Sequence, residues 1–304
     1  MELVMHNFLL PFLLFFSSAF LLFAESVQSY DWSKATELYP GILHAKVALE
    51  EPRLLKLNVV RIDLERPEIR FCCTPADPDW GKPMPDAPDH IIRTRRQTTV
   101  AFMQHARLPK DKGGLGLNMV MAVNATPWSP WRKPFNHKYS DNMGLVISNG
   151  KLVSAVNKRP SFVIYKNGEF AMQQLNEDSD LSSIELALTG FSFVLQDGVP
   201  RGDKALHPRT AYGLSKDKKY LFLLTVDGRQ KNWSLGATTL ELGEWLRQFG
   251  AWEGLNMDGG GSTSLACLLP GEEKEKIELL NRTGGGMRRV ATNLGIYLHS
   301  ENKE

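Results

Sequence analysis

The stretch from Asn256 to Ala266 holds the residues of this chain that are best suited to chemistry. Asp258 is followed by three glycines, 259–261, and by three hydroxyl side chains at 262–264. Glycine is used where the backbone must adopt positive φ or approach a ligand closely, and consecutive glycines expose N–H groups. The stretch therefore predicts the floor of a site for a small polar substrate, although a strand-to-helix turn capped by Ser262 would need similar residues.

The sequence around this stretch predicts a strand, a helix and a second strand. Residues 220–226 form an apolar run that ends at Asp227, and residues 255–258 form a second short strand. The residues between them contain a capping box, an apolar stripe at helical spacing and a glycine stop: Thr238, Glu241, Leu242, Trp245, Leu246, Phe249 and Gly250. In a βαβ unit the two strands are parallel, so Asp227 and Asp258 should lie at the same carboxyl end, where ligands bind.

Paired carboxylates beside a polar cleft suit glycoside hydrolysis, because one attacks or activates water while the other donates a proton. The candidate catalytic residues are Asp258 as nucleophile or base, Asp227 as its partner, and Glu241 in the first turn of the helix. A capping-box glutamate is also explained by bonding to its own helix, so both interpretations of Glu241 stay open.

Arginines are the second group of residues predicted to form the site. Arg209 lies just before a strand, and Arg288 and Arg289 precede the last strand, residues 293–298. An arginine fork matches phosphate or carboxylate oxygens in two-point contact, whereas an isolated surface arginine more often forms a weak ion pair. A phosphate on the leaving side would also reduce the need for a strong general acid.

The rest of the chain predicts a sheet-rich α+β domain with mixed β-sheets and short hairpins, in which the C-terminal βαβ unit carries the site. Residues 45–58, 59–64 and 69–71 are expected to pair as strands, and the apolar run 118–123 to be a strand buried on both faces. Turn dipeptides predict hairpins in the middle of the chain at Asn149-Gly150, Asn167-Gly168 and Asp197-Gly198. Residues 98–106 are compatible with a helix.

Residues 1–26 are expected to be a secretory signal peptide, because an apolar run from Phe8 to Phe23 precedes small residues suited to cleavage. The segment lacks Lys and Arg, and it could instead remain as a membrane anchor. We expect residues 27–44 to be a connector, 45–299 the catalytic domain and 300–304 a tail. The product would be secreted or periplasmic.

Composition excludes several other classes of protein. The formal net charge is +2, with scattered basic residues and no basic helix, so no nucleic-acid partner is expected. Three cysteines are too few for a disulfide scaffold, and a bridge from Cys267 to Cys72 or Cys73 stays open. No metal-ligand spacing is present, and the sequence does not decide whether a divalent ion such as calcium joins the carboxylates. It does not fix the oligomeric state either.

Several motifs, in this order along residues 45–299, make the chain resemble the phosphodiester glycosidase family. They are Asn124-Ala125, Arg209 to Gly213, Val226-Asp227-Gly228, Thr239 to Leu242, Asn256 to Ser262, and Asn281 with Arg288-Arg289-Val290. The resemblance implies site roles for Asn124, Arg209, Thr210, Asp227, Asp258, Gly259, Gly260, Ser262 and Arg288. Thr126-Pro127-Trp128 departs from the glycine and aromatics that such proteins tend to have after the motif asparagine.

These patterns together predict an exported hydrolase that cleaves a glycosyl phosphodiester between the sugar C1 and a phosphate oxygen. Arg209 and Arg288 would hold phosphate, and Asn124, Thr210 and Ser262 would bind hydroxyls. Gly259, Gly260 and Thr263 would be further substrate-binding residues. Two alternatives remain: a module that binds glycan or cell-wall polymer without cutting it, and a glycoside hydrolase that does not recognise phosphate.

Overall fold

The computed structural model describes residues 29–132, 136–271 and 275–299. The predicted signal peptide, residues 1–26, and the predicted tail, 300–304, lie outside the described residues. Among the described helices, none is both long and apolar enough to cross a membrane.

Helices are few in this fold. They are η1 (Trp32–Lys34), α1 (Thr99–Arg107), η2 (Lys110–Lys112), α2 (Thr239–Phe249) and η3 (Gly260–Ser262). The strands are β1 (Thr36–Tyr39), β2 (Ile42–Leu49), β3 (Leu55–Asp63), β4 (Ile69–Cys73), β5 (Pro83–Met84), β6 (Ala87–Ile91), β7 (Thr94–Arg95), β8 (Met119–Asn124), β9 (Trp128–Ser129), β10 (Tyr139–Asn142), β11 (Val146–Ser148), β12 (Lys151–Ser154), β13 (Pro160–Tyr165), β14 (Phe170–Gln174), β15 (Ile184–Thr189), β16 (Ser192–Gln196), β17 (Val199–Pro200), β18 (Arg209–Leu214), β19 (Tyr220–Val226), β20 (Glu253–Asn256), β21 (Leu265–Leu268), β22 (Ile277–Leu279) and β23 (Asn293–Leu298). This content confirms the predicted sheet-rich α+β class.

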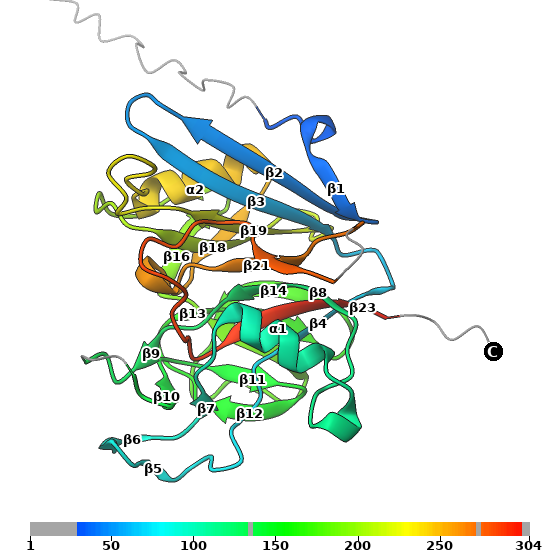
Figure 1. The fold of residues 1–304 in the computed structure, drawn as a ribbon, viewed down its shortest axis with the longest axis vertical. Helices are drawn as coiled ribbons and strands as arrows, with labels where there is room; N and C mark the ends of the chain where they lie inside the picture. Colours follow the sequence, from blue (N-terminus) through cyan, green and yellow to red (C-terminus); the bar gives the residue numbers. More distant parts are fainter. Residues whose placement is uncertain (1–28, 133–135, 272–274, 300–304) are drawn as a thin grey trace, which may run out of the picture.

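Three large sheets are stacked through the molecule (Figure 1). The first has eight strands in the order β1-β2-β3-β19-β18-β20-β16-β17, and α2 covers its outer face. The second has the order β22-β21-β8-β23-β4 and carries α1, and the third has the order β12-β11-β15-β13-β14. The main core joins all three sheets, with buried side chains such as Val60, Met121 and Phe162.

The strands that carry the candidate carboxylates run in the same direction. Strand β18 pairs antiparallel with β19 on one side and with β20 on the other, so β19 and β20 are parallel to each other but not adjacent. Helix α2 connects them and has the expected capping box of Thr238 and Glu241, with Gly250 ending it at φ 105°. The carboxyl ends of β19 and β20 therefore lie at the edge of the sheet where β18 begins.

Local turn chemistry predicted the hairpins correctly. Asn149 and Gly150 both have positive φ and join β11 to β12, and Asp197 and Gly198 do the same between β16 and β17. Strands β13 and β14 form the hairpin expected around Asn167-Gly168. Strand β8 is buried along its whole length, as its apolar run predicted.

Two expectations about the first part of the chain are wrong. Residues 29–44 are not a simple connector, because they contain η1 and the edge strand β1, and β2 begins at Ile42. Strand β4 does not pair with β2 or β3, which pair with each other; it joins β23 in the second sheet, far along the chain. The three cysteines are free thiols, and no disulfide links them.

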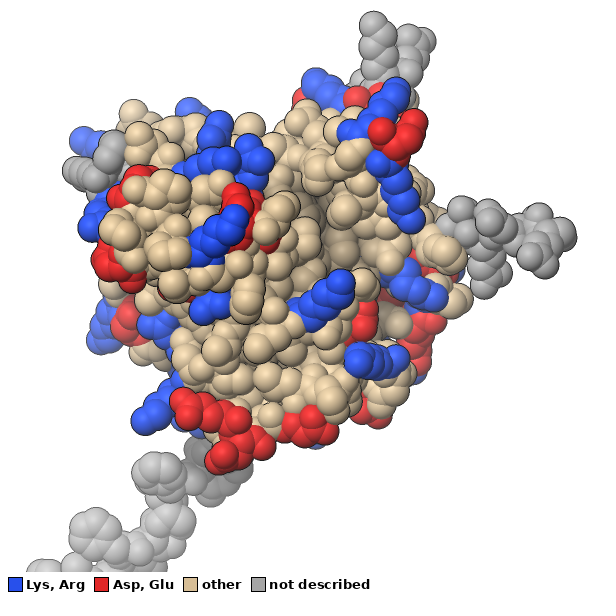
Figure 2. All heavy atoms as spheres, turned by 90° about the horizontal axis from the view of Figure 1, so that it is seen from below, with Lys and Arg blue, Asp and Glu red and all other residues tan. Residues whose placement is uncertain are grey.

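Lys and Arg side chains are scattered over the face shown in Figure 2, with Asp and Glu between them. This face shows no continuous patch of one sign, in keeping with the mixed charges of the sequence.

Candidate functional site

Two adjoining cavities open beside the carboxyl ends of β19 and β20. The first, which we call the Asp258 cavity, has a volume of about 690 Å³, and the second, the Asp227 cavity, has about 730 Å³. Both lie in the size range of small-molecule sites. Four residues line both cavities, Arg229, Gly260, Gly261 and Arg288, so the two form one cleft with a shared boundary.

Asp258 is the buried acid of the first cavity. Only 8% of the residue is exposed, and its Oδ2 atom has no hydrogen-bond partner among the described residues. Burial raises the pKa of Asp258 to about 6, against the opposing effects of the nearby Ser262 hydroxyl and the Arg288 charge. A carboxyl that titrates near neutral pH at a cavity wall is suited to acid, base or nucleophilic chemistry.

Other buried polar atoms near Asp258 also lack partners within hydrogen-bonding distance. They are Trp128 Nε1, Asn256 Oδ1, Ser262 Oγ and Thr263 Oγ1, and each belongs to a residue that lines the cleft or touches Asp258. Buried polar groups are normally hydrogen-bonded, and each exception calls for an explanation. The Trp128 and Ser262 groups lie near the Asp258 carboxyl and lower its pKa, whereas Asn256 lines the Asp258 cavity and Thr263 the Asp227 cavity, where a polar ligand can complete their hydrogen bonds.

Asn124 and Thr210 lie beneath the site and hold it in place. The Asn124 amide donates to the Asp258 carbonyl at 2.6 Å, and its Oδ1 accepts from the Thr210 hydroxyl at 2.8 Å and from the Ser264 N–H at 3.0 Å. Both residues are fully buried and neither is among the cavity-lining residues. These hydrogen bonds hold the backbone on both sides of the glycines, and the contacts with substrate hydroxyls stay a prediction.

The glycines after Asp258 allow two arginines to approach the backbone. Gly260 has φ +62°, which favours glycine, and a Cβ on Gly261 would lie only 2.6 Å from Nη2 of Arg288. Gly259 lines the Asp258 cavity, where a Cβ would meet the Pro208 carbonyl at 2.9 Å. Three consecutive glycines are explained by these close contacts.

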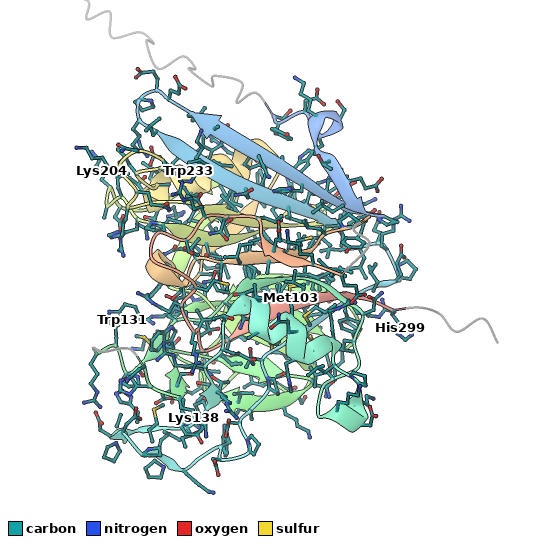
Figure 3. All side chains as sticks on the ribbon, viewed as in Figure 1. Met103, Trp131, Lys138, Lys204, Trp233 and His299 are labelled. Carbon is teal, nitrogen blue, oxygen red and sulfur yellow. The ribbon has the colours of Figure 1, made fainter. Side chains whose placement is uncertain are left out.

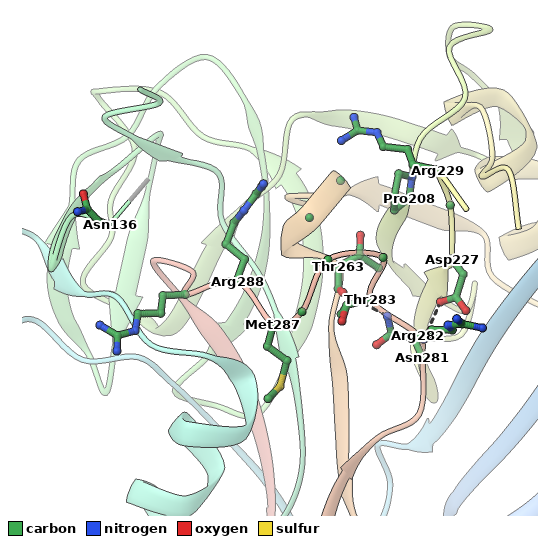
Figure 4. A pocket seen from close by; sticks show the side chains of 17 residues that line it. Asn136, Pro208, Asp227, Arg229, Thr263, Asn281, Arg282, Thr283, Met287 and Arg288 are labelled. Atoms are coloured by element: carbon green, nitrogen blue, oxygen red, sulfur yellow. Dashed lines mark hydrogen bonds between the residues drawn. The ribbon is translucent and has the colours of Figure 1, made fainter. Parts of the chain in front are cut away.

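Arg229 and Arg288 lie on either side of η3 (Figure 4). Arg229 adopts a left-handed conformation, φ 58°, which is strained for a residue with a side chain. Its Nη2 donates to Nδ1 of His207 at 2.9 Å. Arg288 lies over the ring of Trp131, with 4.8 Å between the guanidinium carbon and the ring centre.

His207 also lines the Asp258 cavity. Burial and the charges of Arg209 and Arg229 lower the pKa of His207, so its imidazole is neutral at neutral pH. Because Arg229 donates to Nδ1, the proton of the neutral ring is on Nε2.

Arg209, the predicted phosphate ligand, lines the same cavity but already bonds to the protein. Its guanidinium donates to the carbonyls of Ala237 at 3.1 Å and Ala205 at 2.7 Å, and it pairs with the exposed Asp203 at 3.6 Å. Burial lowers the pKa of Arg209. The side chain thus holds the wall of the cavity together.

Asp227, the predicted partner of Asp258, faces the other cavity. Its Oδ2 accepts from the Trp233 indole at 2.6 Å. Its Oδ1 accepts from the Arg282 N–H at 3.0 Å, as Figure 4 shows. Burial raises the pKa of the Asp227 carboxyl, while these hydrogen bonds act in the opposite direction. Both oxygens are therefore engaged, and the residue ties the loop after β19 to the loop after β22.

Glu241 is not brought into the cleft. Its carboxylate accepts from the Thr238 N–H at 2.9 Å and from Arg53 at 2.6 Å, and it lines a separate small cavity with Arg53. Burial alone would raise the pKa of Glu241, but the hydrogen bonds from Arg53 and Thr238 outweigh it and lower this pKa. The capping interpretation explains the residue completely.

Three aromatic side chains, which we call the aromatic wall, line the Asp258 cavity: Trp128, Trp131 and Phe191. Trp128 and Trp131 meet edge to face at 5.1 Å, and Arg96 lies 3.9 Å from the ring centre of Trp128. The Arg96 side chain donates to the carbonyls of Arg289 and His137, which fixes it there. Trp131 and Trp233 lie on the same side of the molecule (Figure 3).

Arg229, His207 and the aromatic wall were not predicted from the sequence as parts of the site. Trp128 belongs to the stretch after the motif asparagine and His207 lies two residues before the Arg209 motif, but Arg229 follows Asp227-Gly228 with no signal for its left-handed backbone. Among the described residues, no group of three or more His, Cys, Asp or Glu side chains is placed to hold a metal ion.

A family model of phosphodiester glycosidases matches residues 118–297, more than half of the chain. The chain belongs to the phosphodiester glycosidase family. The match begins just before β8. It includes Asp227, Asp258, Arg288 and all the residues that line the two cavities. A search of curated proteins found no match.

Solved structures share the fold of this chain. The catalytic domain of zebrafish N-acetylglucosamine-1-phosphodiester alpha-N-acetylglucosaminidase, auto-inhibited by its pro-peptide, is 18% identical over 88% of this chain and 87% of its own, with a TM-score of 0.57. A hypothetical protein of Synechocystis is 14% identical over 86% and 62%, with a TM-score of 0.57. A protein of Burkholderia pseudomallei named as an exported protein is 14% identical over 80% and 74%, with a TM-score of 0.51.

Proposed function

We propose that this protein hydrolyses glycosyl phosphodiesters, breaking the bond between the sugar C1 and a phosphate oxygen. Family membership supports a hydrolase of this class. The observation that carries the specific proposal is the buried Asp258, whose Oδ2 is unpartnered and whose pKa burial raises to about 6. It lies in a cleft that also holds Arg229 and Arg288.

Asp258 acts in this proposal as the nucleophile or as the base that activates water. Water supplies the new hydroxyl at C1, the C1–O bond breaks, and a phosphate monoester leaves with the bonding electrons. Such a leaving group needs little protonation, so one ionised carboxylate is enough for the chemistry. Both carboxylate oxygens of Asp227 accept hydrogen bonds, so in this proposal Asp227 is a positioning residue and not a second catalytic carboxylate.

The phosphate occupies the boundary that the two cavities share, between Arg229 and Arg288. These arginines reach both cavities, so a diester bound there places its sugar on one side and its leaving group on the other. Arginine forks suit the non-bridging oxygens of a diester, and they also stabilise the charge that develops on the leaving phosphate. Arg209 supports the wall of the cavity.

The sugar occupies the Asp258 cavity against Trp128, Trp131 and Phe191. Aromatic faces pack on the apolar C–H faces of a sugar ring, and the unpartnered Oδ1 atom of Asn256 is available to its hydroxyls. The zebrafish protein is named for N-acetylglucosamine-1-phosphodiesters, which makes this sugar the first probe in a panel.

The decisive experiment measures sugar release from methyl glycosyl-1-phosphodiesters by wild type, Asp258→Asn and a matched variant. Asp203→Asn is the matched control, because Asp203 lines the same cavity but is largely exposed and paired with Arg209. We expect Asp258→Asn to lose at least about 10³-fold in kcat and Asp203→Asn to stay within about threefold. Unchanged turnover by a folded Asp258→Asn would remove Asp258 from the chemistry.

Two further outcomes would favour the alternative functions. Tight binding of several glycans without release by the wild type would indicate a binding module. Equal turnover of phosphate-free glycosides and phosphodiesters, unaffected by Arg288→Ala, would indicate a glycosidase that does not recognise phosphate.

We also propose that the protein is exported by residues 1–26. The apolar leader supports this, as does the likeness to the B. pseudomallei protein named as exported. Cell fractionation with and without residues 1–26 is the test, and retention of the full chain in the cytoplasm would contradict it.

A further inference from the structure

Arg96 is a buried cation next to the cleft. Only 4% of the residue is exposed, and no carboxylate among the described residues forms an ion pair with its guanidinium. Burying a charge is costly unless its surroundings compensate for it, so a buried arginine without an ion pair calls for an explanation. Arg96 precedes residues 118–297, which match the family model, and family membership therefore assigns it no role.

The guanidinium of Arg96 contacts two parts of the cleft. Its carbon atom lies 3.9 Å from the ring centre of Trp128, a member of the aromatic wall. Its Nε and Nη2 atoms donate to the Arg289 carbonyl at 3.1 and 2.8 Å, and its Nη1 atom donates to the His137 carbonyl at 3.1 Å. One planar side chain thus holds both the Trp128 indole and the backbone that directly follows Arg288.

Both of the groups that Arg96 holds in this way act on Asp258. The Arg288 charge and the Trp128 indole lower the pKa of Asp258, against the rise that burial causes. The Ser262 hydroxyl and the Gly259 N–H act in the same direction as these two groups. The ionisation of Asp258 therefore depends on where the Trp128 and Arg288 side chains lie.

Arg96 and Asp258 also influence each other through their charges. Burial and the charges of Arg288 and Arg289 lower the pKa of Arg96 to about 10. The charges of Asp258 and Asp86 act in the opposite direction. Arg96 is therefore a cation at neutral pH, and because the interaction of two charges is mutual, it favours the ionised form of Asp258.

We propose that Arg96 is a positioning residue of this site. It holds the Trp128 indole and the Arg288 guanidinium beside Asp258, so that this carboxyl is ionised when substrate binds and the phosphate meets a fixed cation. The inference rests on the proposed function for its effect on turnover. The ionisation of Asp258, in contrast, is a property of the free protein and can be measured without any substrate.

The first test follows the ionisation of Asp258 in the free protein by carbon-13 NMR of labelled aspartate carboxyls, and Asp258→Asn identifies the signal. Arg96→Met removes the charge and the hydrogen bonds, so we expect the titration midpoint of Asp258 to rise from about 6 by about one pH unit. Arg61→Met is the matched control, because Arg61 also stacks on an aromatic ring, Trp32 at 4.7 Å, but lies outside both cavities. It should leave the midpoint unchanged.

The second test measures hydrolysis of the methyl glycosyl-1-phosphodiester that the wild type cleaves fastest. Arg96→Met should raise KM about tenfold and move the acid limb of the kcat/KM profile to higher pH, with kcat within about threefold of the wild type above that limb. If Arg96 acts through Arg288, the two substitutions are not independent. The Arg96→Met/Arg288→Ala variant should then lose less kcat/KM than the product of the two single losses.

Arg96→Lys is a second variant, because it keeps the charge but its ammonium cannot reproduce the planar fork. We expect its KM to rise about as much as in Arg96→Met, with a smaller rise of the Asp258 midpoint. If Arg96→Met does not fold, a wild-type KM and a wild-type midpoint in Arg96→Lys overturn the proposal.

The outcomes separate the two proposals. A folded Arg96→Met with the midpoint and the KM of the wild type overturns the role of Arg96. Losses that multiply in the double variant refute the action through Arg288. A raised midpoint in Arg96→Met, together with a wild type that hydrolyses no ester of the sugar panel, refutes the proposed function and supports the effect of Arg96 on Asp258.

Discussion

Replacing Asp258 by asparagine should stabilise the protein at neutral pH while abolishing its activity. In the folded state burial raises the pKa of Asp258 to about 6 from the reference value of 3.8, so the folded state disfavours the ionised form. Because the folded-state pKa of Asp258 lies above its unfolded-state pKa, this carboxyl contributes most to the free energy of unfolding below pH 3.8. This contribution is lost as the pH rises through the folded pKa.

The size of the effect follows from the difference between the two pKa values. About two pKa units at 1.36 kcal/mol each give a penalty of about 3 kcal/mol at pH 7.5 for the ionised wild type. At pH 4 the same two pKa values give an ionisation penalty of only about 0.5 kcal/mol. Asparagine cannot ionise, so Asp258→Asn should exceed the wild type in free energy of unfolding by these amounts.

Denaturant unfolding of both proteins at pH 7.5 and pH 4 measures the difference. Asp227→Asn is the control, because each oxygen of Asp227 accepts from an N–H group and an amide would oppose a donor to one of them. Burial also raises the pKa of Asp227, so relief of that penalty offsets part of the cost of about 1–3 kcal/mol for the opposed donor, and this variant should gain less than Asp258→Asn at pH 7.5. Equal stability of wild type and Asp258→Asn at pH 7.5, or a gap that does not shrink at pH 4, would refute the reasoning.

Four other perturbations test separate parts of the site. If Asp258 must be ionised, kcat/KM should fall about tenfold per pH unit below about pH 6 in a pH–rate profile, and a flat profile down to pH 4.5 would contradict this. Gly261→Ala places a Cβ against Arg288, so we expect KM for phosphodiesters to rise about tenfold with little change in thermal unfolding, as in Arg288→Ala. Asn124→Ala removes the donor to the Asp258 carbonyl and should cost about 1–3 kcal/mol of stability as well as activity, whereas an effect on KM alone would indicate substrate contact. Glu241→Gln should lower stability by about 1 kcal/mol in denaturant unfolding and leave kcat unchanged, because the carboxylate caps α2.

Elements whose signals are local could be predicted from the sequence. The capping box of α2 and the Asn-Gly turn before β12 depend on residues that are neighbours in the chain, and both were predicted correctly. Strand pairing is not local: β4 pairs with β23, and β18 separates β19 from β20. Hydrophobic pattern shows that a strand is buried, but it does not say which strand lies beside it.

The same distinction applies to the candidate site. Asp258 could be found because its glycines and hydroxyls follow it directly, but the fate of Asp227 depended on Trp233 and on Arg282, 55 residues away along the chain. Asp227 and Asp258 each follow a short apolar strand in the sequence, but the folded chain surrounds their carboxylates differently. One carboxylate has an unpartnered oxygen in a cavity, and the other is fully hydrogen-bonded.

The three glycines after Asp258 acquire a specific explanation from this arrangement. They do not cradle a phosphate with backbone N–H groups alone, since the Gly260 N–H already donates to the Pro208 carbonyl. Their missing side chains let Arg288 pack on Gly261 and let Arg229 reach Gly260 from the opposite side. The phosphate-binding charge of the proposed site therefore comes from loops distant in sequence, and the glycine stretch provides the surface on which the two arginines converge beside Asp258.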